Sequence, residues 1–196
     1  MRTRIMMLLV LGCTPLLADV AVAAAPEQAT EQATQRVQTR EYDKKLRFVR
    51  EAYEQQDWER AYRLASETAR WGDKWSQYVL GSLYLDGKGG ADENVLLAYG
   101  WLAAAAESGI KDFVDGAARL KAAIPEQHHA EADAAARALI NRYGLQATGV
   151  RCEKRRPTGS NMRVLDCRKP HSLMDEWVEV PAYDEKAIAQ QQRDDD

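Results

Sequence analysis

Residues 80–109 read LGSLYLDGKGGADENVLLAYGWLAAAAESG, and this stretch predicts two helices joined by a glycine-rich turn. Its first part places apolar side chains at positions 80, 83 and 84, which is the spacing of one helix face. The first helix is predicted to stop at the glycine-rich turn that contains Gly87 and Gly89. Gly109 is predicted to end the second helix, because glycine adopts a left-handed conformation at little cost. The second part of the stretch is rich in alanine, and small side chains let two helices approach closely. We therefore expect a closely packed helix pair.

The second helix of this stretch repeats a pattern that lies 37 residues earlier. The paired positions are Ala61 with Ala98, Leu64 with Trp101, Thr68 with Ala105, Ala69 with Ala106 and Gly72 with Gly109. A period in the thirties built from helix pairs is typical of an α-solenoid. The fold class that we expect is mainly α, with a short α/α solenoid of about three helix pairs over residues 41–145. The pair at 110–145 would close the core.

The pattern resembles the Sel1-like repeat, a relative of the tetratricopeptide repeat. Ten positions within residues 76–109 match this repeat in register: Leu80, Gly81, Tyr84, Gly87, Gly89, Ala98, Trp101, Ala105, Ala106 and Gly109. Residues 44–72 look more like a generic tetratricopeptide-type helix pair. The chain departs from the family at Gly90, which replaces a hydrophobic residue, and by one extra residue after Asp92-Glu93. The resemblance implies a helical repeat core built on these ten residues.

Residues 1–23 predict a secretory signal peptide. Arg2 and Arg4 precede an apolar run, and Ala21 and Ala23 provide the small residues of a cleavage site. We therefore expect a periplasmic protein. The alternative is a membrane-anchored lipoprotein, since residues 10–13 loosely resemble a lipobox ending at Cys13. Residues 24–40, rich in Gln, Thr and Glu, are predicted to form a flexible linker.

After the helical region, short β-like runs flank turn residues at 157–161. We expect residues 146–181 to form a small appendage built on a β-hairpin. Cys152 and Cys167 remain as an even pair once Cys13 is removed, and an oxidising compartment favours a disulfide between them. A redox-active pair is the alternative, but such pairs usually have Cys-x-x-Cys spacing. Residues 182–196 are predicted to be an acidic disordered tail.

The formal net charge of −3 conceals two opposed charge runs. Residues 151–169 hold seven Lys or Arg against two acids, and residues 175–196 hold eight acids against two bases. The predicted basic patch consists of Arg151, Lys154, Arg155, Arg156, Arg163 and Arg168. One interpretation is a surface for the cell wall or an anionic lipid. The other is solvation or neutralisation by the acidic tail, the more usual fate of a charge run.

Motifs for catalysis and metal binding are missing from the sequence. His128 and His129 are adjacent, so on a helix they point about 100° apart and cannot share a metal as an i, i+4 pair could. The sequence contains no nucleophile elbow, phosphate-binding loop or metalloprotease motif. We therefore expect no enzymatic activity, no cofactor and no metal site. Nucleic acid is not an expected partner of an exported, near-neutral chain.

Aromatic residues provide the candidates for partner binding: Trp71, Trp75, Tyr62 and Tyr99. Trp71 and Trp75 flank the turn between repeats, at positions that the repeat normally gives to polar surface residues. Exposed tryptophan is enriched at interface hot spots, although the solenoid or the appendage could instead cover both rings. The predicted function is a non-catalytic protein–protein interaction module of the bacterial cell envelope. The alternatives are a protein that uses the basic patch on the cell wall or an anionic surface, and an envelope enzyme.

Overall fold

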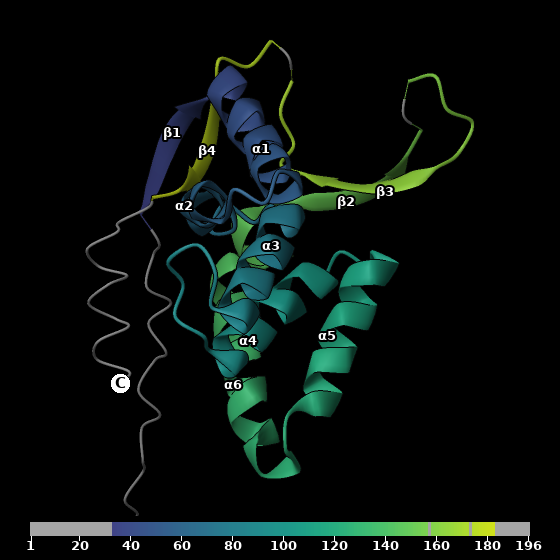
Figure 1. Ribbon diagram of the computed structural model, residues 1–196. Coiled ribbons are helices and arrows are strands. Elements are labelled where there is room, and N and C mark those ends of the chain that lie inside the picture. Colours follow the sequence, from purple (N-terminus) through teal and green to yellow (C-terminus); the bar gives the residue numbers. More distant parts are fainter. Residues whose placement is uncertain (1–32, 157, 173, 183–196) are drawn as a thin grey trace, which may run out of the picture. The chain divides into compact units, whose positions relative to one another are not determined.

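The computed structural model describes residues 33–156, 158–172 and 174–182 (Figure 1). In chain order the elements are β1 (Thr34–Gln38), α1 (Thr39–Glu54), α2 (Trp58–Thr68), α3 (Lys74–Asp86), α4 (Val95–Ala106), α5 (Lys111–Ala123), the 3-10 turn η1 (Glu126–His128), α6 (His129–Tyr143), α7 (Leu145–Thr148), β2 (Arg151–Arg155), β3 (Val164–Arg168) and β4 (Trp177–Pro181). The described chain is mainly helical, as the sequence predicted. The predicted signal peptide, with Cys13, and residues 183–196 of the predicted tail lie outside the described residues.

Short polar side chains define where the central helices begin. Asp57, Asp73 and Asn94 precede α2, α3 and α4, and each accepts a hydrogen bond from the backbone N–H three residues later. Such a cap satisfies one of the donors that a helix start leaves free. At the other end of α3, Gly87 has a φ of 61°, so it provides a left-handed stop within the glycine-rich turn expected from the sequence.

The main core lies where α3 and α4 pack together. Leu80, Ala98 and Trp101 are each at most 2% exposed. Gly81 permits the close approach of the two helices, because a Cβ there would lie 3.0 Å from the carbonyl oxygen of Ala98. The indole of Trp101 stacks on Tyr143 of α6 with ring centroids 5.4 Å apart, so α4 is also joined to the last long helix.

Gly72 and Gly90 form a matched pair for testing the packing of the α2–α3 turn. Both have a φ of +92°, but a Cβ on Gly72 would lie 2.2 Å from Thr148 Oγ1, whereas a Cβ on Gly90 would meet no atom within 4 Å. We expect Gly90→Ala to lower the free energy of unfolding by about 1 kcal/mol through backbone strain alone. Gly72→Ala adds the steric overlap, for a total of about 2–3 kcal/mol. Urea unfolding measures both values, and equal losses would show that α7 moves aside freely.

A second core contradicts part of the predicted linker at 24–40. Residues 34–38 form β1, which pairs antiparallel with β4, and α1 already begins at Thr39. The inner face of this sheet places Val178 and Val180 against Tyr42 and Trp71, all at most 4% exposed. The strand was missed because Val37 is its only large apolar residue, and its partner is distant in the sequence. Apolar burial under the sheet holds this segment in place.

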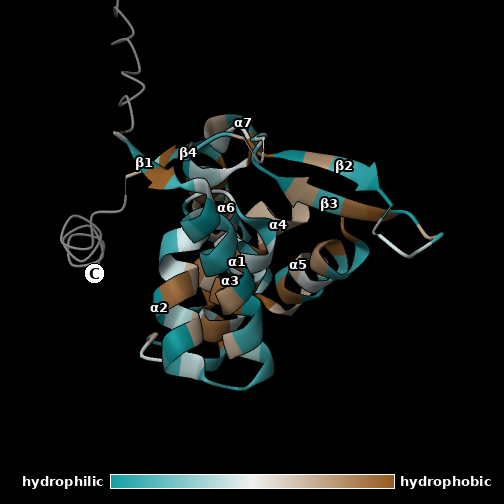
Figure 2. Ribbon diagram, turned by 90° about the horizontal axis from the view of Figure 1, so that it is seen from above, coloured by the Kyte–Doolittle hydropathy of each residue, from teal (hydrophilic) through white to brown (hydrophobic). Residues whose placement is uncertain are grey.

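The region 146–181, predicted as one hairpin appendage, is divided into separate elements. The helix α7 extends to Thr148, while β4 belongs to the sheet with β1. The hairpin consists of β2 and β3, with Cys152 directly opposite Cys167 in the register. The predicted disulfide between these two residues is confirmed. In Figure 2, β2 is mostly hydrophilic, and the loop joining the strands extends beyond the helices, as it does in Figure 1.

Candidate functional site

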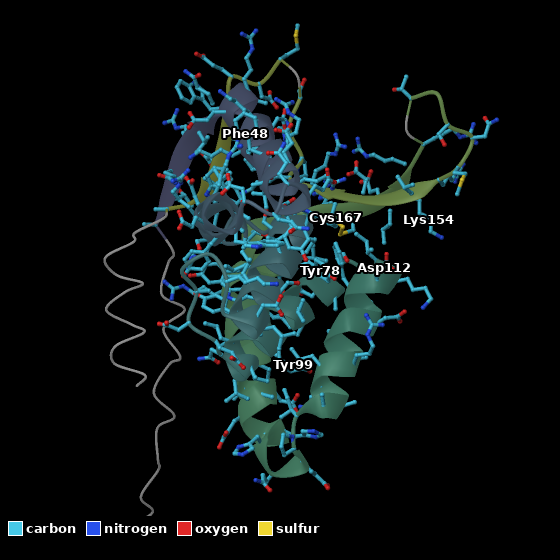
Figure 3. All side chains as sticks on the ribbon, viewed as in Figure 1. Phe48, Tyr78, Tyr99, Asp112, Lys154 and Cys167 are labelled. Atoms are coloured by element: carbon cyan, nitrogen blue, oxygen red, sulfur yellow. A yellow bond between two sulfur atoms is a disulfide. The ribbon has the colours of Figure 1, made fainter. Side chains whose placement is uncertain are left out.

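A cleft with a volume of about 560 Å³ lies between α1, the starts of α3 and α5, and strand β3. In Figure 3 the labelled residues Tyr78, Asp112 and Cys167 mark α3, α5 and β3 around it. Its apolar lining consists of Leu46, Trp75, Ile110, Phe113 and Leu165. Charged side chains also line it: Asp43, Arg47, Arg50, Asp112, Asp166 and Arg168. The cleft therefore offers apolar surface together with charges of both signs.

The side chains of α1 reach the cleft because their spacing follows the helix. Tyr42, Leu46 and Arg50 are separated by four residues each, and Asp43 and Arg47 repeat the same step one position later. Residues four apart lie on one side of a helix, so this side of α1 lines the cleft along its length. The site thus depends on α1 being helical from its first turn.

Trp75 and Phe113 line the floor of the cleft, and further aromatic rings pack against them. The centroid of the Trp75 ring lies 5.9 Å from that of Tyr78 and 6.0 Å from that of Phe113. The rings of Tyr78 and Phe113 stack on each other with centroids 4.8 Å apart. Tyr53 meets the Trp75 ring edge-on at 6.2 Å. Contacts on several sides fix the orientation of the half-buried indole. A ligand would therefore meet a preorganised apolar surface.

Arg50 lies over this floor and forms no ion pair with any residue that the structure describes. Its guanidinium carbon is 4.7 Å from the centroid of Trp75, a cation–π contact. Its neighbour Arg47, in contrast, pairs with Glu51 at 3.6 Å. The guanidinium of Arg50 is exposed and can donate a bidentate pair of hydrogen bonds to a carboxylate.

Asp73 and Lys74 also line the cleft, but they are structural rather than free charges. Burial raises the pKa of the Asp73 carboxyl, opposed by its hydrogen bonds from Ser76 and by the charge of Arg50. Burial also lowers the pKa of Lys74, opposed mainly by its hydrogen bond to Glu107. Both groups already have partners within the fold, so neither is available as a reactive acid or base.

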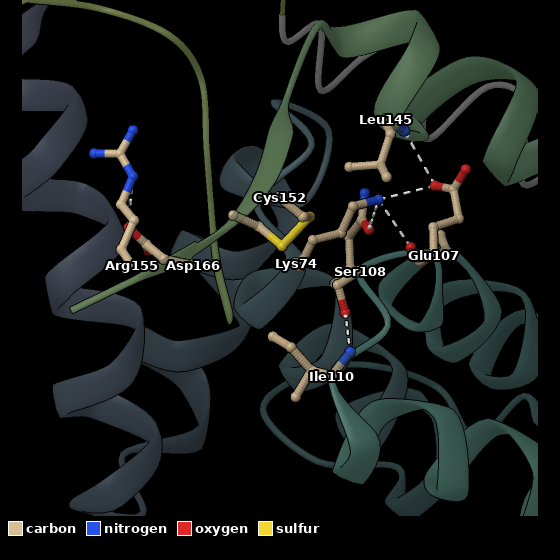
Figure 4. The surroundings of a disulfide bond; sticks show 11 residues. Lys74, Glu107, Ser108, Ile110, Leu145, Cys152, Arg155 and Asp166 are labelled. Atoms are coloured by element: carbon tan, nitrogen blue, oxygen red, sulfur yellow. Dashed lines mark hydrogen bonds and ion pairs between the residues drawn. A yellow bond between two sulfur atoms is a disulfide. The ribbon is translucent and has the colours of Figure 1, made fainter. Parts of the chain in front are cut away.

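Lys74 joins three helices from its buried position (Figure 4). Its Nζ donates to the carbonyl oxygen of Ala104 at 2.8 Å, to Glu107 Oε2 at 2.9 Å and to Gln77 Oε1 at 3.1 Å. The same Glu107 oxygen accepts the backbone N–H of Leu145 at 3.1 Å, which brings α7 into the network. The sequence did not suggest this role, since a lysine after a helix cap is normally a surface residue.

The four aromatic residues predicted to bind a partner lie in different environments, and only one of them lines the cleft. Trp71 is 0% exposed, so its prediction as an exposed contact is wrong: the β1–β4 sheet covers it. Trp75 does line the cleft. Tyr62 lies with its hydroxyl 3.3 Å from that of Tyr84, and Tyr99 lies 5.1 Å below the ammonium of Lys121. Neither of these two tyrosines belongs to the cleft lining.

The six residues of the predicted basic patch are all exposed, but they fall into two groups. Arg168 and Arg155 both pair with Asp166, at 2.5 Å and 3.9 Å, and Arg168 also lines the cleft. The remaining four form no ion pair with any described residue: Arg151, Lys154, Arg156 and Arg163. These four cations are also absent from the cleft lining.

Sequence reasoning missed Leu46, Arg50 and Leu165 as members of the site. The four-residue spacing of α1 could have suggested the first two, whereas nothing local places β3 beside α5.

Within the described residues, no group of three or more His, Cys, Asp or Glu side chains could hold a metal ion. None of the helices in the described ranges has both the length and the apolar character needed to cross a bilayer. The chain matches no protein-family model, no curated protein and no solved structure.

Proposed function

We propose that the chain is a non-catalytic protein–protein interaction module of the bacterial cell envelope, which binds its partner in the cleft. One observation carries this proposal: in a cleft that Phe113 also lines, the guanidinium of Arg50 lies 4.7 Å from the centroid of Trp75 and forms no ion pair with a described residue. Arginine and tryptophan are the residue types that dominate interface energetics. A rigid floor lowers the entropy cost of binding.

The arrangement of helices supports a short Sel1-like solenoid as the framework of this module. Consecutive helices α1 to α4 pack against their neighbours, and α4 also contacts α5 and α6. The cleft is lined by α1, α3 and α5, together with β3. The helices of the third predicted pair, α5 and α6, both pack mainly on α4 rather than on each other, so α1 to α4 are the part that fits two repeats. In a solenoid, equivalent helices of successive repeats share one surface, which is where such proteins bind extended ligands.

The chemistry of the cleft favours a peptide segment that carries a carboxylate next to an apolar side chain. The carboxylate would pair with Arg50, and the apolar group would cover Trp75 and Phe113. Since Asp112 lies on the opposite wall, a cationic group further along the same peptide would complete the contact.

A photo-crosslinker placed in the cleft tests the proposal in intact cells. Benzoylphenylalanine at Arg47, in the cleft, is expected to form a discrete protein adduct. The same group at Arg137, exposed on α6, is the control. Adding Arg50→Glu should reduce the adduct about tenfold, the effect of losing one moderate hot spot. Arg119→Glu, a matched change on α5, should leave it unchanged. Identical adducts from both positions, or none from the cleft, would contradict the proposal.

Location in the periplasm is part of the proposal and rests on the signal-like N-terminal sequence. Cleavage after Ala23 and lipidation of Cys13 give mature chains of different mass. Intact-mass measurement of the mature protein therefore decides between a soluble periplasmic protein and an anchored lipoprotein.

A further inference from the structure

The β2–β3 hairpin has a neutralised base and an uncompensated tip. At the base, Asp166 pairs with Arg168 and Arg155, and Glu153 lies 3.5 Å from Arg155. The base also forms the β3 wall of the cleft. The two acidic and two basic side chains of the base therefore neutralise one another.

The tip consists of Lys154 and residues 156–164, and its sequence contains no acidic residue. Lys154, Arg156 and Arg163 are exposed there, and none of them pairs with an acid in the part of the chain that the structure describes. In Figure 3, Lys154 lies on the hairpin away from the helices. The tip therefore presents positive charge to an external partner.

Apolar side chains are exposed among these cations. Met162 is 73% exposed and Val164 is 44% exposed. A Cβ added to Gly159, in the same loop, would meet no atom within 4 Å, so no described residue packs against the loop at this position. The register and the Cys152–Cys167 disulfide hold the two strands together, so Arg156, Met162 and Arg163 follow directly from a closed pair of strands.

We propose that this tip docks on a bilayer containing anionic lipids. Cations next to an exposed apolar residue fit a bilayer interface, with the charges among the phosphates and the apolar group below them. A single-stranded nucleic acid would require aromatic stacking surfaces, and residues 151–168 contain no Phe, Tyr or Trp. A wall polymer would use the charge but gain nothing from Met162. The inference is independent of the function proposed for the cleft.

Co-sedimentation with vesicles tests the proposal on the full chain. Vesicles of neutral phosphatidylcholine are compared with vesicles that contain phosphatidylglycerol, at low and at physiological salt. We expect Arg156→Gln/Arg163→Gln to weaken binding to the anionic vesicles at least tenfold, since each cation near such a surface contributes about fivefold. Met162→Gln should weaken binding by a smaller factor that does not depend on salt. Every variant carries the same N-terminal residues, so differences between them report on the hairpin.

The control is Arg119→Gln/Arg137→Gln, which removes the same charge from α5 and α6 and should change binding less than twofold. A fluorophore attached at Asn161→Cys, in a Cys13→Ser background, should shift to the blue on anionic vesicles, whereas one at Ala134→Cys should not. Three outcomes would each overturn the proposal. They are equal losses of binding in the two double variants, equal binding to both vesicle types, and a fluorophore at the tip that does not respond to anionic vesicles. Tip-dependent sedimentation with purified peptidoglycan, without vesicle binding, would overturn it in favour of the cell wall.

Discussion

Lys74→Ala is expected to lower the free energy of unfolding by about 3–5 kcal/mol, the usual cost of removing one partner from a buried ion pair. The side chain of Lys74 is 1% exposed, and its ammonium satisfies Glu107, Gln77 and the carbonyl of Ala104 together. Without it these acceptors stay buried with fewer partners, and α3, α4 and α7 lose their common anchor. Urea unfolding followed by circular dichroism measures the loss.

An exposed ion pair provides the control for Lys74. Lys88 lies 2.8 Å from Asp86, but both side chains are more than two-fifths exposed. Lys88→Ala should therefore change the free energy of unfolding by no more than about 1 kcal/mol. Similar losses for the two variants would mean that the Lys74 network contributes no more than a surface contact does.

The lowered pKa of Lys74 adds a pH-dependent signature. Because burial lowers this pKa in the folded state, the unfolded chain binds more protons at this residue as the pH approaches 10.5. The stability that this group contributes therefore rises with pH between its lowered pKa in the folded state and 10.5, its pKa in the unfolded chain. Lys74→Met should remove this component, so the difference in stability between wild type and variant should depend on pH. A difference that stays constant between pH 8 and 10.5 would contradict the lowered pKa.

Trp71→Ala is expected to cost about 3–5 kcal/mol, because it removes a fully buried aromatic side chain. The indole stacks on Tyr42 with ring centroids 5.4 Å apart and packs under Val178 and Val180. Its loss would leave a cavity between the helices and the β1–β4 sheet. Chemical denaturation gives the change in stability, and amide exchange of residues 34–38 and 177–181 should show that the sheet loosens first.

Trp177 is the matched control for Trp71. It belongs to the same sheet but is 42% exposed, so Trp177→Ala should cost less than about 1 kcal/mol. If Trp71→Ala folded with unchanged stability but formed no adduct in the crosslinking experiment, Trp71 would belong to the binding surface. That result would restore the interpretation that its burial contradicts.

The sequence predicted the helices well because their signals are local. Helix caps, alanine-rich crossings and the left-handed glycines all lie within a few residues of the elements that they define. The cysteine pair was predictable for a similar reason, since two cysteines separated by turn residues leave few alternatives. The β1–β4 sheet gave no such signal: its strands are short, and the hydrogen bond that joins Thr39 to Asp175 spans 136 positions.

The cleft was hard to predict because no single segment contains it. Trp75 was identified by its residue type, but its contact with Arg50 requires α1 and α3 to be side by side. Trp71 shows the opposite error, since the sequence predicted it at a surface position, whereas strands from both ends of the described chain cover it. Composition indicates which residues can form an interface, but only tertiary packing decides which of them are accessible.

The sheet that joins residues 34–38 to residues 177–181 packs β4, the last described strand, against α1, the first described helix. Removing residues 177–181 would take away Val178 and Val180, which cover Tyr42 and Trp71, and would leave an apolar patch exposed on α1 and the α2–α3 turn. Such a patch is what chaperones and proteases recognise in incomplete proteins. The burial of Tyr42 and Trp71, near the start of the described chain, therefore depends on side chains near its end, those of Val178 and Val180.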